Sequence, residues 1–133
     1  MARSAPQRQE VRAESPIHVF KFEELAVWKR AILFADRIYD DSQDFPDEEK
    51  FGLKCLVRRA VVSIASNIAE RSAQPDPDFA RFVGYAAGSL YEVITQVTIA
   101  RNRSYLTDDE LSSLYREGEE ISRMLSGLRD SLE

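Results

Sequence analysis

The chain has 133 residues, of which 44% are hydrophobic and 31% are charged. This length supports one domain with a substantial core but not two ordinary domains, and the composition is that of a globular soluble protein rather than a disordered one. The 23 acidic and 18 basic residues give a formal net charge of −5, which argues against a surface that binds nucleic acid through phosphates.

A single histidine and a single cysteine limit the chemistry that the chain can support. His18 alone supplies neither the paired Glu-x-x-His ligands of di-iron bundles nor the full residue set of a Ser-His-Asp or Cys-His site. Cys55 cannot form an internal disulfide, and we interpret it as a small core residue, with a reactive thiol as the alternative. We therefore expect no metal, cofactor, small-molecule substrate or enzymatic activity. A helical enzyme built from Glu, Arg and Tyr is the alternative.

No segment approaches the roughly 18 uninterrupted apolar residues that a membrane-spanning helix needs. The N-terminal sequence MARSAPQRQEVRAESP lacks the apolar stretch of a signal peptide. These features predict a cytoplasmic protein without membrane contact.

The chain divides into a polar arm and a helical body. Residues 1–21 are rich in Ser, Pro, Arg and Glu and have no apolar period, which predicts a flexible N-terminal arm. Residues 22–133 contain four stretches in which apolar residues recur at helical spacing, with no convincing strand between them. Pro46 and Pro77 suit the first turns of the second and third helices, where no backbone donor is needed. The expected helices cover about 23–42, 47–73, 77–103 and 108–131.

The last stretch begins with Thr107-Asp-Asp-Glu110, a capping box in which the Thr hydroxyl and the Glu carboxylate each accept a free backbone N–H. Behind it, apolar residues alternate at spacings of three and four, the pattern of a helix that packs nearly parallel or antiparallel to its neighbours. The connections between the four helices are short, so consecutive helices should run antiparallel. We therefore predict an all-α fold, an up-down-up-down antiparallel four-helix bundle.

The second helix carries polar residues beside its apolar arc. On a helical wheel these residues lie at the margin of the core, and buried polar groups need hydrogen-bond partners or cost about 1–3 kcal/mol each. We interpret them as a structural polar line that fixes helix register. A ligand site on the same residues and simple exposure to solvent are the alternatives. The predicted line consists of Arg59, Ser63, Asn67 and Glu70 of the second helix with Ser89 and Glu92 of the third.

The third helix contains GYAAGSLYE, residues 84–92, in which two glycines each cost about 1 kcal/mol of helix propensity relative to Ala. They align with a tyrosine and a threonine in a narrow stripe away from the predicted core. Small residues at this spacing let the backbone of another helix approach closely, so the stripe predicts a second packing face and an oligomer. The predicted oligomer face is Gly84, Gly88, Tyr91 and Thr95.

Three segments of the chain resemble a known family. Phe22-Glu-Glu-Leu-Ala-Val-Trp28 is similar to the family's opening pattern, and Arg58-Arg-Ala-Val-Val-Ser-Ile-Ala-Ser-Asn-Ile-Ala-Glu70 to its most characteristic stretch. Phe79…Phe82…Ala87-Gly88-Ser89…Glu92 is similar to its third-helix pattern. The family is that of the bacterial 23S rRNA-intervening-sequence proteins, generally described as four helix bundle proteins, and the resemblance spans about residues 20–125.

The resemblance implies a bundle that assembles into a ring-like homo-oligomer, a pentamer. Some members are encoded inside sequences that interrupt ribosomal RNA genes, and the distantly similar accessory proteins of diversity-generating retroelements bind a reverse transcriptase and RNA. The resemblance thus implies a scaffold whose partner is RNA or a nucleoprotein, and it supplies no catalytic residues. A protein-binding adaptor without nucleic-acid contact is the alternative. The family usually has Gly where this chain has Arg71 and usually Pro where it has Ala65. The change at Arg71 concerns the end of the second helix and not the fold.

Charge is unevenly distributed along the chain. Residues 107–133 contain eight acidic and three basic residues and sum to −5, whereas residues 46–74 contain five basic and four acidic residues and sum to +1. A basic patch is therefore expected where the second helix begins and the third ends, with solvated or ion-paired side chains as the alternative. A ring repeats such a patch in every subunit, so weak contacts combine. The predicted nucleic-acid patch is Lys50, Lys54, Arg58, Arg59, Arg101 and Arg103.

Overall fold

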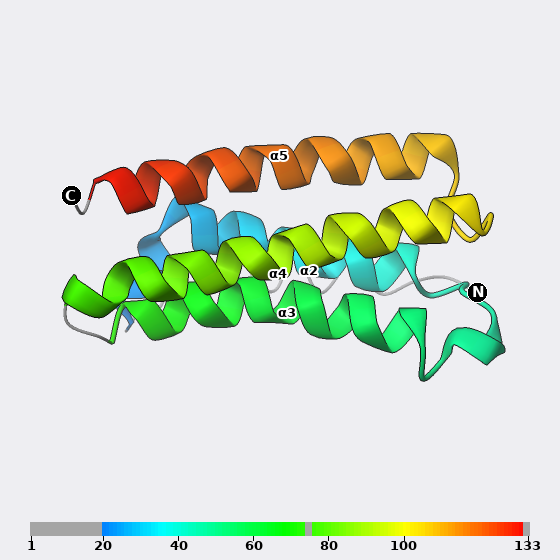
Figure 1. The fold of residues 1–133 in the computed structure, drawn as a ribbon, viewed down its shortest axis with the longest axis horizontal. Helices are drawn as coiled ribbons and strands as arrows, with labels where there is room; N and C mark the ends of the chain where they lie inside the picture. Colours follow the sequence, from blue (N-terminus) through cyan, green and yellow to red (C-terminus); the bar gives the residue numbers. More distant parts are fainter. Residues whose placement is uncertain (1–19, 74–75, 132–133) are drawn as a thin grey trace.

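The computed structural model describes residues 20–73 and 76–131 (Figure 1). The described residues contain no strand, and they form the antiparallel four-helix bundle that the sequence predicted. Each consecutive pair of α-helices packs side by side, and the first also packs against the last, which closes the bundle. The elements in chain order are the 3-10 helix η1 (Lys21–Glu24), α2 (Ala26–Asp41), the 3-10 helix η2 (Asp47–Glu49), α3 (Leu53–Arg71), α4 (Asp76–Asn102) and α5 (Asp108–Asp130).

The core is built from apolar residues that recur at three- and four-residue spacing on each of the four α-helices. Burial of each of these side chains contributes roughly 1.5–3 kcal/mol, which is the main force that holds the bundle together. The largest of the buried side chains are Phe34, Ile38, Val57, Val61, Ile64, Ile68, Leu90, Val93, Val97, Leu114, Ile121 and Leu125.

The N-terminal boundary differs slightly from the expected one. The predicted arm, residues 1–21, lies almost wholly outside the described residues, but its last residue, Lys21, begins η1. The backbone N–H of Phe20 donates to the Glu23 carboxylate at 3.0 Å, which closes this short turn. The first α-helix then begins at Ala26 rather than at residue 23.

The start of α3 differs more, because residues 47–52 do not continue into the helix. Asp47–Glu49 form η2, and Gly52 has φ −104° and ψ −116°, which no α-helix contains. The Glu49 carboxylate accepts the backbone N–H of Leu53 at 2.9 Å and so occupies the first free donor of α3. A Cβ on Gly52 would lie 2.7 Å from that carboxylate oxygen, so a side chain there would displace the Glu49 carboxylate from this position. The helix therefore begins at residue 53 instead of the expected 47.

The turn between α4 and α5 is tied to the start of α3 by Tyr105. Its hydroxyl donates to the second oxygen of the Glu49 carboxylate at 3.2 Å, and its ring packs against Phe45 with 5.5 Å between centroids. The pKa of Arg103 is raised chiefly by a hydrogen bond with Tyr105, with a further contribution from the charge of Glu49. Ser104 reverses the chain with a φ of 66°, in the left-handed region. One end of the bundle is thus held together by side chains from both of its helical connections.

The predicted capping box at the start of α5 is confirmed. The backbone N–H of Glu110 donates to the Thr107 hydroxyl at 3.0 Å, and that of Thr107 donates to the Glu110 carboxylate at 2.8 Å. Two turns further on, Glu117 accepts two hydrogen bonds from the Arg30 guanidinium of α2, at 2.8 and 2.9 Å. This contact holds the pKa of Glu117 below its usual range, mainly through the hydrogen bond with Arg30. The first and last helices are therefore joined by a two-bond ion pair.

Candidate functional site

α4 has a second face that no described part of the subunit covers. Gly84, Gly88, Tyr91 and Thr95 are all exposed, and Tyr91 is 63% exposed. A Cβ added at either glycine meets nothing within 4 Å. The Thr95 hydroxyl donates to the backbone carbonyl of Tyr91 at 2.8 Å, so it is satisfied within its own helix. The predicted oligomer face is a continuous open stripe, and its partner remains a prediction.

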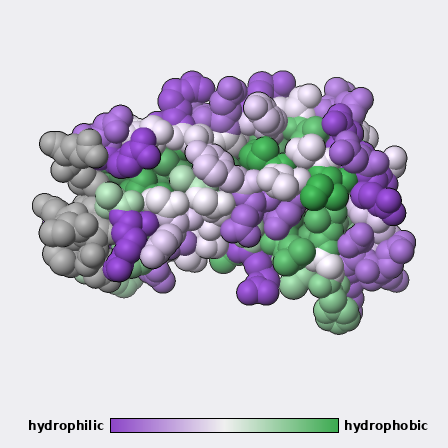
Figure 2. Space-filling model, viewed as in Figure 1, coloured by the Kyte–Doolittle hydropathy of each residue, from purple (hydrophilic) through white to green (hydrophobic). Residues whose placement is uncertain are grey.

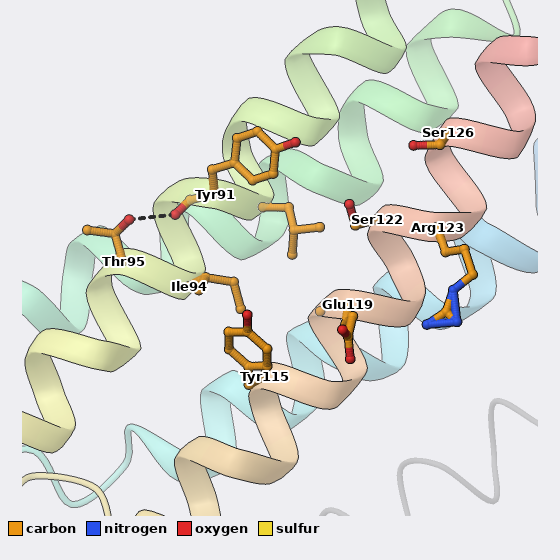
Figure 3. Close-up of a pocket in the computed structure, with 10 residues that line it drawn as sticks. Tyr91, Ile94, Thr95, Tyr115, Glu119, Ser122, Arg123 and Ser126 are labelled. Carbon is orange, nitrogen blue, oxygen red and sulfur yellow. Dashed lines mark hydrogen bonds between the residues drawn. The ribbon is translucent and has the colours of Figure 1, made fainter.

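A groove of about 670 Å³ runs beside this stripe, between α4 and α5 (Figure 3). Gly118 lies at its floor, where a Cβ would come within 2.8 Å of the Ile94 side chain, so the glycine lets α5 lie close to α4. The walls combine two tyrosines with small polar and charged side chains. The other lining residues are Leu90, Tyr91, Thr95, Tyr115, Glu119, Ser122, Arg123 and Ser126.

The outer side of α3 is also apolar, which the sequence-based prediction did not include. Leu56 and Val62 are 48% and 44% exposed, and both lie off the apolar arc that faces the core. Their positions on the helical wheel, outside the arc that faces the core, could have predicted this second apolar face. Figure 2 shows hydrophilic residues gathered over α5 and hydrophobic patches lower, over α4 and α3. Of the ten large hydrophobic side chains exposed among the described residues, five lie on α3 and α4: Leu56, Val62, Tyr85, Tyr91 and Ile99.

The structure joins three of the six residues of the predicted polar line. The Ser63 hydroxyl accepts from the Asn67 amide at 3.0 Å and from the Ser89 hydroxyl of α4 at 2.9 Å. Asn67 also donates to the backbone carbonyl of Ser63 at 2.8 Å. The hydrogen bond from Ser89 to Ser63 crosses the α3–α4 contact next to the core, where Ser89 is buried, and the two from Asn67 lie within α3.

The other three residues stay outside the line. Arg59, Glu70 and Glu92 are exposed and make no hydrogen bond or ion pair among residues 20–73 and 76–131. These three residues lie on the outer surface of α3 and α4, beside the contact that Ser63 and Ser89 make. The two helices therefore meet through small neutral side chains and leave their charges on the outer surface.

The predicted basic patch comes together at one end of the bundle, but much of its charge is engaged. Arg58 turns away toward α2, where it donates to the Ser42 hydroxyl and the Tyr39 carbonyl, both at 2.9 Å, and lies 4.5 Å from the Tyr39 ring centroid. Arg101 forms an ion pair with Asp108 at 3.1 Å.

The other four residues of this predicted patch differ in whether a neighbouring group engages their charge. Lys54 donates to the Gln43 carbonyl at 3.3 Å. Arg103 is exposed but bonded to Tyr105 beside Glu49. Lys50 and Arg59 are exposed without an ion pair among the described residues. The patch is thus weaker than the sequence indicated, because neighbouring acidic and carbonyl groups hold most of its cations.

Chemistry that depends on clustered ligands finds no support in the described part of the chain. Residues 20–73 and 76–131 contain no group of three or more His, Cys, Asp and Glu side chains placed to hold a metal ion. His18 lies outside the described residues, and Cys55 is half-buried on α3. Among the helices described, none combines the length and the apolar character that crossing a membrane requires.

The fold and surface define a four-helix bundle with one charged side and one side that carries exposed glycine, tyrosine and aliphatic residues. A profile of the 23S rRNA-intervening sequence protein family matches residues 23–127, and the chain belongs to this family. The chain is also similar to the crystal structure of a protein of unknown function from the S23 ribosomal protein family of Bacteroides thetaiotaomicron. The two are 24% identical with a TM-score of 0.72, over 78% of this chain and 95% of that chain, which supports the fold. A comparison with curated proteins gives no match.

Proposed function

We propose that the protein is a scaffold, a ring-like homo-oligomer of about five helical bundles that acts by binding rather than by catalysis. The observation that carries this proposal is the exposed stripe of Gly84 and Gly88 in the middle of α4. Each glycine costs about 1 kcal/mol of helix propensity. Nothing in residues 20–73 and 76–131 lies within 4 Å of either missing Cβ, so packing within the described part of the subunit does not explain them. Close approach of a helix from another subunit does, and the ring of about five is what the family resemblance implies.

The stripe is part of a larger contact surface. A stable interface buries roughly 800 Å² on each partner, more than a row of glycines offers. Tyr91 and Tyr115, which are 63% and 53% exposed at the groove beside the stripe, supply the large amphipathic rings that dominate many interfaces. The exposed aliphatic residues of α3 extend the same side of the bundle.

The proposal is tested by the mass of the protein in solution. Light scattering after size exclusion should give a multiple of the 15.2 kDa subunit mass for the wild type. Gly88→Leu should reduce the mass to that of one subunit while circular dichroism stays helical, because the new side chain blocks helix approach. Gly127→Leu on α5 is the matched control, since that glycine is also exposed with nothing within 4 Å, and it should leave assembly unchanged. A wild-type mass near 15.2 kDa at micromolar concentration would contradict the proposal.

A second proposal is that the assembled scaffold binds RNA at the end of the bundle where α3 begins. The observation that favours it is Lys50 beside Phe51, with the ammonium 5.5 Å from a ring that is 86% exposed. Single-stranded nucleic acids bind to such pairs by stacking bases on the aromatic ring and placing phosphates near the cation.

The RNA proposal predicts strong salt dependence. Binding of a single-stranded RNA oligonucleotide should weaken steeply above about 50 mM salt and should be lost in Lys50→Glu with Lys54→Glu. Lys29→Glu, an exposed charge reversal on α2, is the control. Binding that ignores salt, or no binding at about 50 mM, would exclude this proposal and favour an adaptor that contacts protein alone.

A further inference from the structure

The outer surface formed by α3 and α4 has very few charges. Between Gly84 and Ile99, α4 carries one charged residue, Glu92. Between Cys55 and Glu70, α3 carries three, and one of them, Arg58, is bonded to α2. The charges left on this surface are therefore Arg59, Glu70 and Glu92, all exposed and without a hydrogen bond or ion pair among the described residues.

Arg59 and Glu92 lie at nearly the same height along the bundle. The Ser63 and Ser89 hydroxyls are 2.9 Å apart, so these two residues lie at the same height along the bundle, where α3 contacts α4. Arg59 precedes Ser63 by four residues, and Glu92 follows Ser89 by three. Because the helices are antiparallel and rise about 1.5 Å per residue, the two residues are displaced in the same direction by about 6 and 4.5 Å.

We infer that α3 of one subunit packs against α4 of the next, and that Arg59 pairs there with Glu92 of the partner subunit. This inference rests on the proposed self-assembly and names the two surfaces that meet. A closed ring of more than two subunits needs two different surfaces that fit each other. α3 and α4 together carry five exposed large hydrophobic side chains, against two on α2 and one on α5. Rotation about an axis parallel to the helices keeps each residue at its height, so the cation on α3 meets the anion on α4.

The ion pair sets the register of the assembly. In an apolar contact, a charge that finds no partner loses its hydration without compensation, so registers that separate Arg59 from the partner subunit's Glu92 are disfavoured. The aliphatic and tyrosine side chains supply most of the contact area, and the charges select one alignment. This explains why charges remain on a surface that otherwise has few.

Charge reversal tests the pairing. R59E and E92R should each place like charges opposite one another and raise the subunit dissociation constant by about tenfold or more, measured by light scattering over a dilution series. Lys29→Glu, a reversal of the same size on the outer side of α2, should leave the dissociation constant unchanged. Circular dichroism of each variant should match that of the wild type.

Mixing the two variants shows whether the pair joins subunits. R59E and E92R chains that alternate in a ring present opposite charges at every contact, so a mixture should assemble where each variant alone does not. Alternation satisfies every contact only in a ring with an even number of subunits, so a five-membered mixed ring keeps one like-charge contact.

The possible outcomes distinguish failure of the Arg59–Glu92 pair from failure of the proposed self-assembly. A wild type that is monomeric contradicts self-assembly itself. A wild type that assembles, with R59E and E92R unaffected, overturns the ion pair alone. Single variants that dissociate and are rescued in the double variant R59E/E92R, while their mixture dissociates as readily as either variant alone, would show that the pair lies within one subunit, which also overturns the inference.

Discussion

The two sides of the bundle differ in how their helices face outward. Six of the 16 residues of α2 and ten of the 23 of α5 are charged, against five of 19 in α3 and five of 27 in α4. A helix with one apolar stripe and one charged face suits the surface of a protein, whereas a helix with apolar residues on both faces suits burial on both sides. The outer faces of α3 and α4 accordingly carry five of the exposed large hydrophobic side chains, whereas those of α2 and α5 carry three and more of the charge.

The contacts that close the two sides differ in the same way. α3 and α4 are joined by the neutral hydrogen bond from Ser89 to Ser63, which also accepts from Asn67, whereas α2 and α5 are joined by the ion pair of Arg30 and Glu117. Neutral hydrogen bonds are little affected by salt or by moderate pH, but a partly exposed ion pair responds to both. The two contacts can therefore be perturbed separately.

The largest expected effect comes from filling the space where α5 meets α4. Gly118→Leu should lower the free energy of unfolding by about 2–3 kcal/mol, because even a Cβ would lie 2.8 Å from the Ile94 side chain. Gly127→Leu on the same helix points into open space and should raise the stability by up to about 1 kcal/mol through helix propensity. Urea unfolding of both variants measures the contrast. Equal effects would show that the groove floor is not close-packed.

A smaller loss is expected at the neutral contact between α3 and α4. Ser63→Ala removes the acceptor that both Asn67 and buried Ser89 use, so it should cost about 1–2 kcal/mol, independent of salt. Ser66→Ala makes the same change one turn away at an exposed position and should stay within about 0.5 kcal/mol of the wild type. If the two variants unfold at the same urea concentration, Ser63 has no role in holding the helices together.

The smallest effect is expected at the ion pair between α2 and α5. Glu117→Gln should cost about 0.5–1 kcal/mol at pH 7, and less at high salt, because part of the pair is exposed. The pKa of Glu117 is lower in the folded protein than in the unfolded chain, so its contribution is complete above the unfolded pKa of about 4.3 and is lost as the pH falls through the folded value.

Thermal unfolding of this variant between pH 7 and about pH 2.5 should therefore show the wild type and Glu117→Gln converging at low pH. Glu119→Gln, at an exposed carboxylate without an ion pair, should follow the wild type throughout. A difference that persists in acid would mean that Gln disturbs packing rather than removing a charge contact.

Much of this fold follows from the spacing of apolar residues. The four helices, their inward faces and the capping box of Thr107 and Glu110 were all predicted, because each depends on residues close together in the chain. The late start of α3 was not, since Asp47 to Glu49 read as a good first turn. The break depends on the contact of Glu49 with Leu53 across Gly52 and with Tyr105 from a distant turn.

The candidate site residues were also predictable only where the prediction did not depend on distant contacts. A helical wheel gives the direction of a side chain but not its partner, so it grouped Arg59 and Glu92 with Ser63 and Ser89 although only the serines touch. Arg58 illustrates the limit for long side chains, because its guanidinium reaches from α3 to the end of the neighbouring helix α2. The open stripe of Gly84 and Gly88 was predictable, since a glycine has no side chain whose reach must be known.

The contact between α2 and α5, which includes the ion pair of Arg30 and Glu117, is also the one that we expect to open most easily. The ion pair joins residues separated by 87 positions, whereas the other main contacts among the four α-helices join consecutive helices. When this contact breaks, α2 and α5 remain attached only through α3 and α4 respectively, and each can swing away as a unit. Backbone amides of α2 and α5 should then exchange with solvent faster than those of α3 and α4. The two central helices remain paired during such openings, so a surface built on them persists while the outer helices fluctuate.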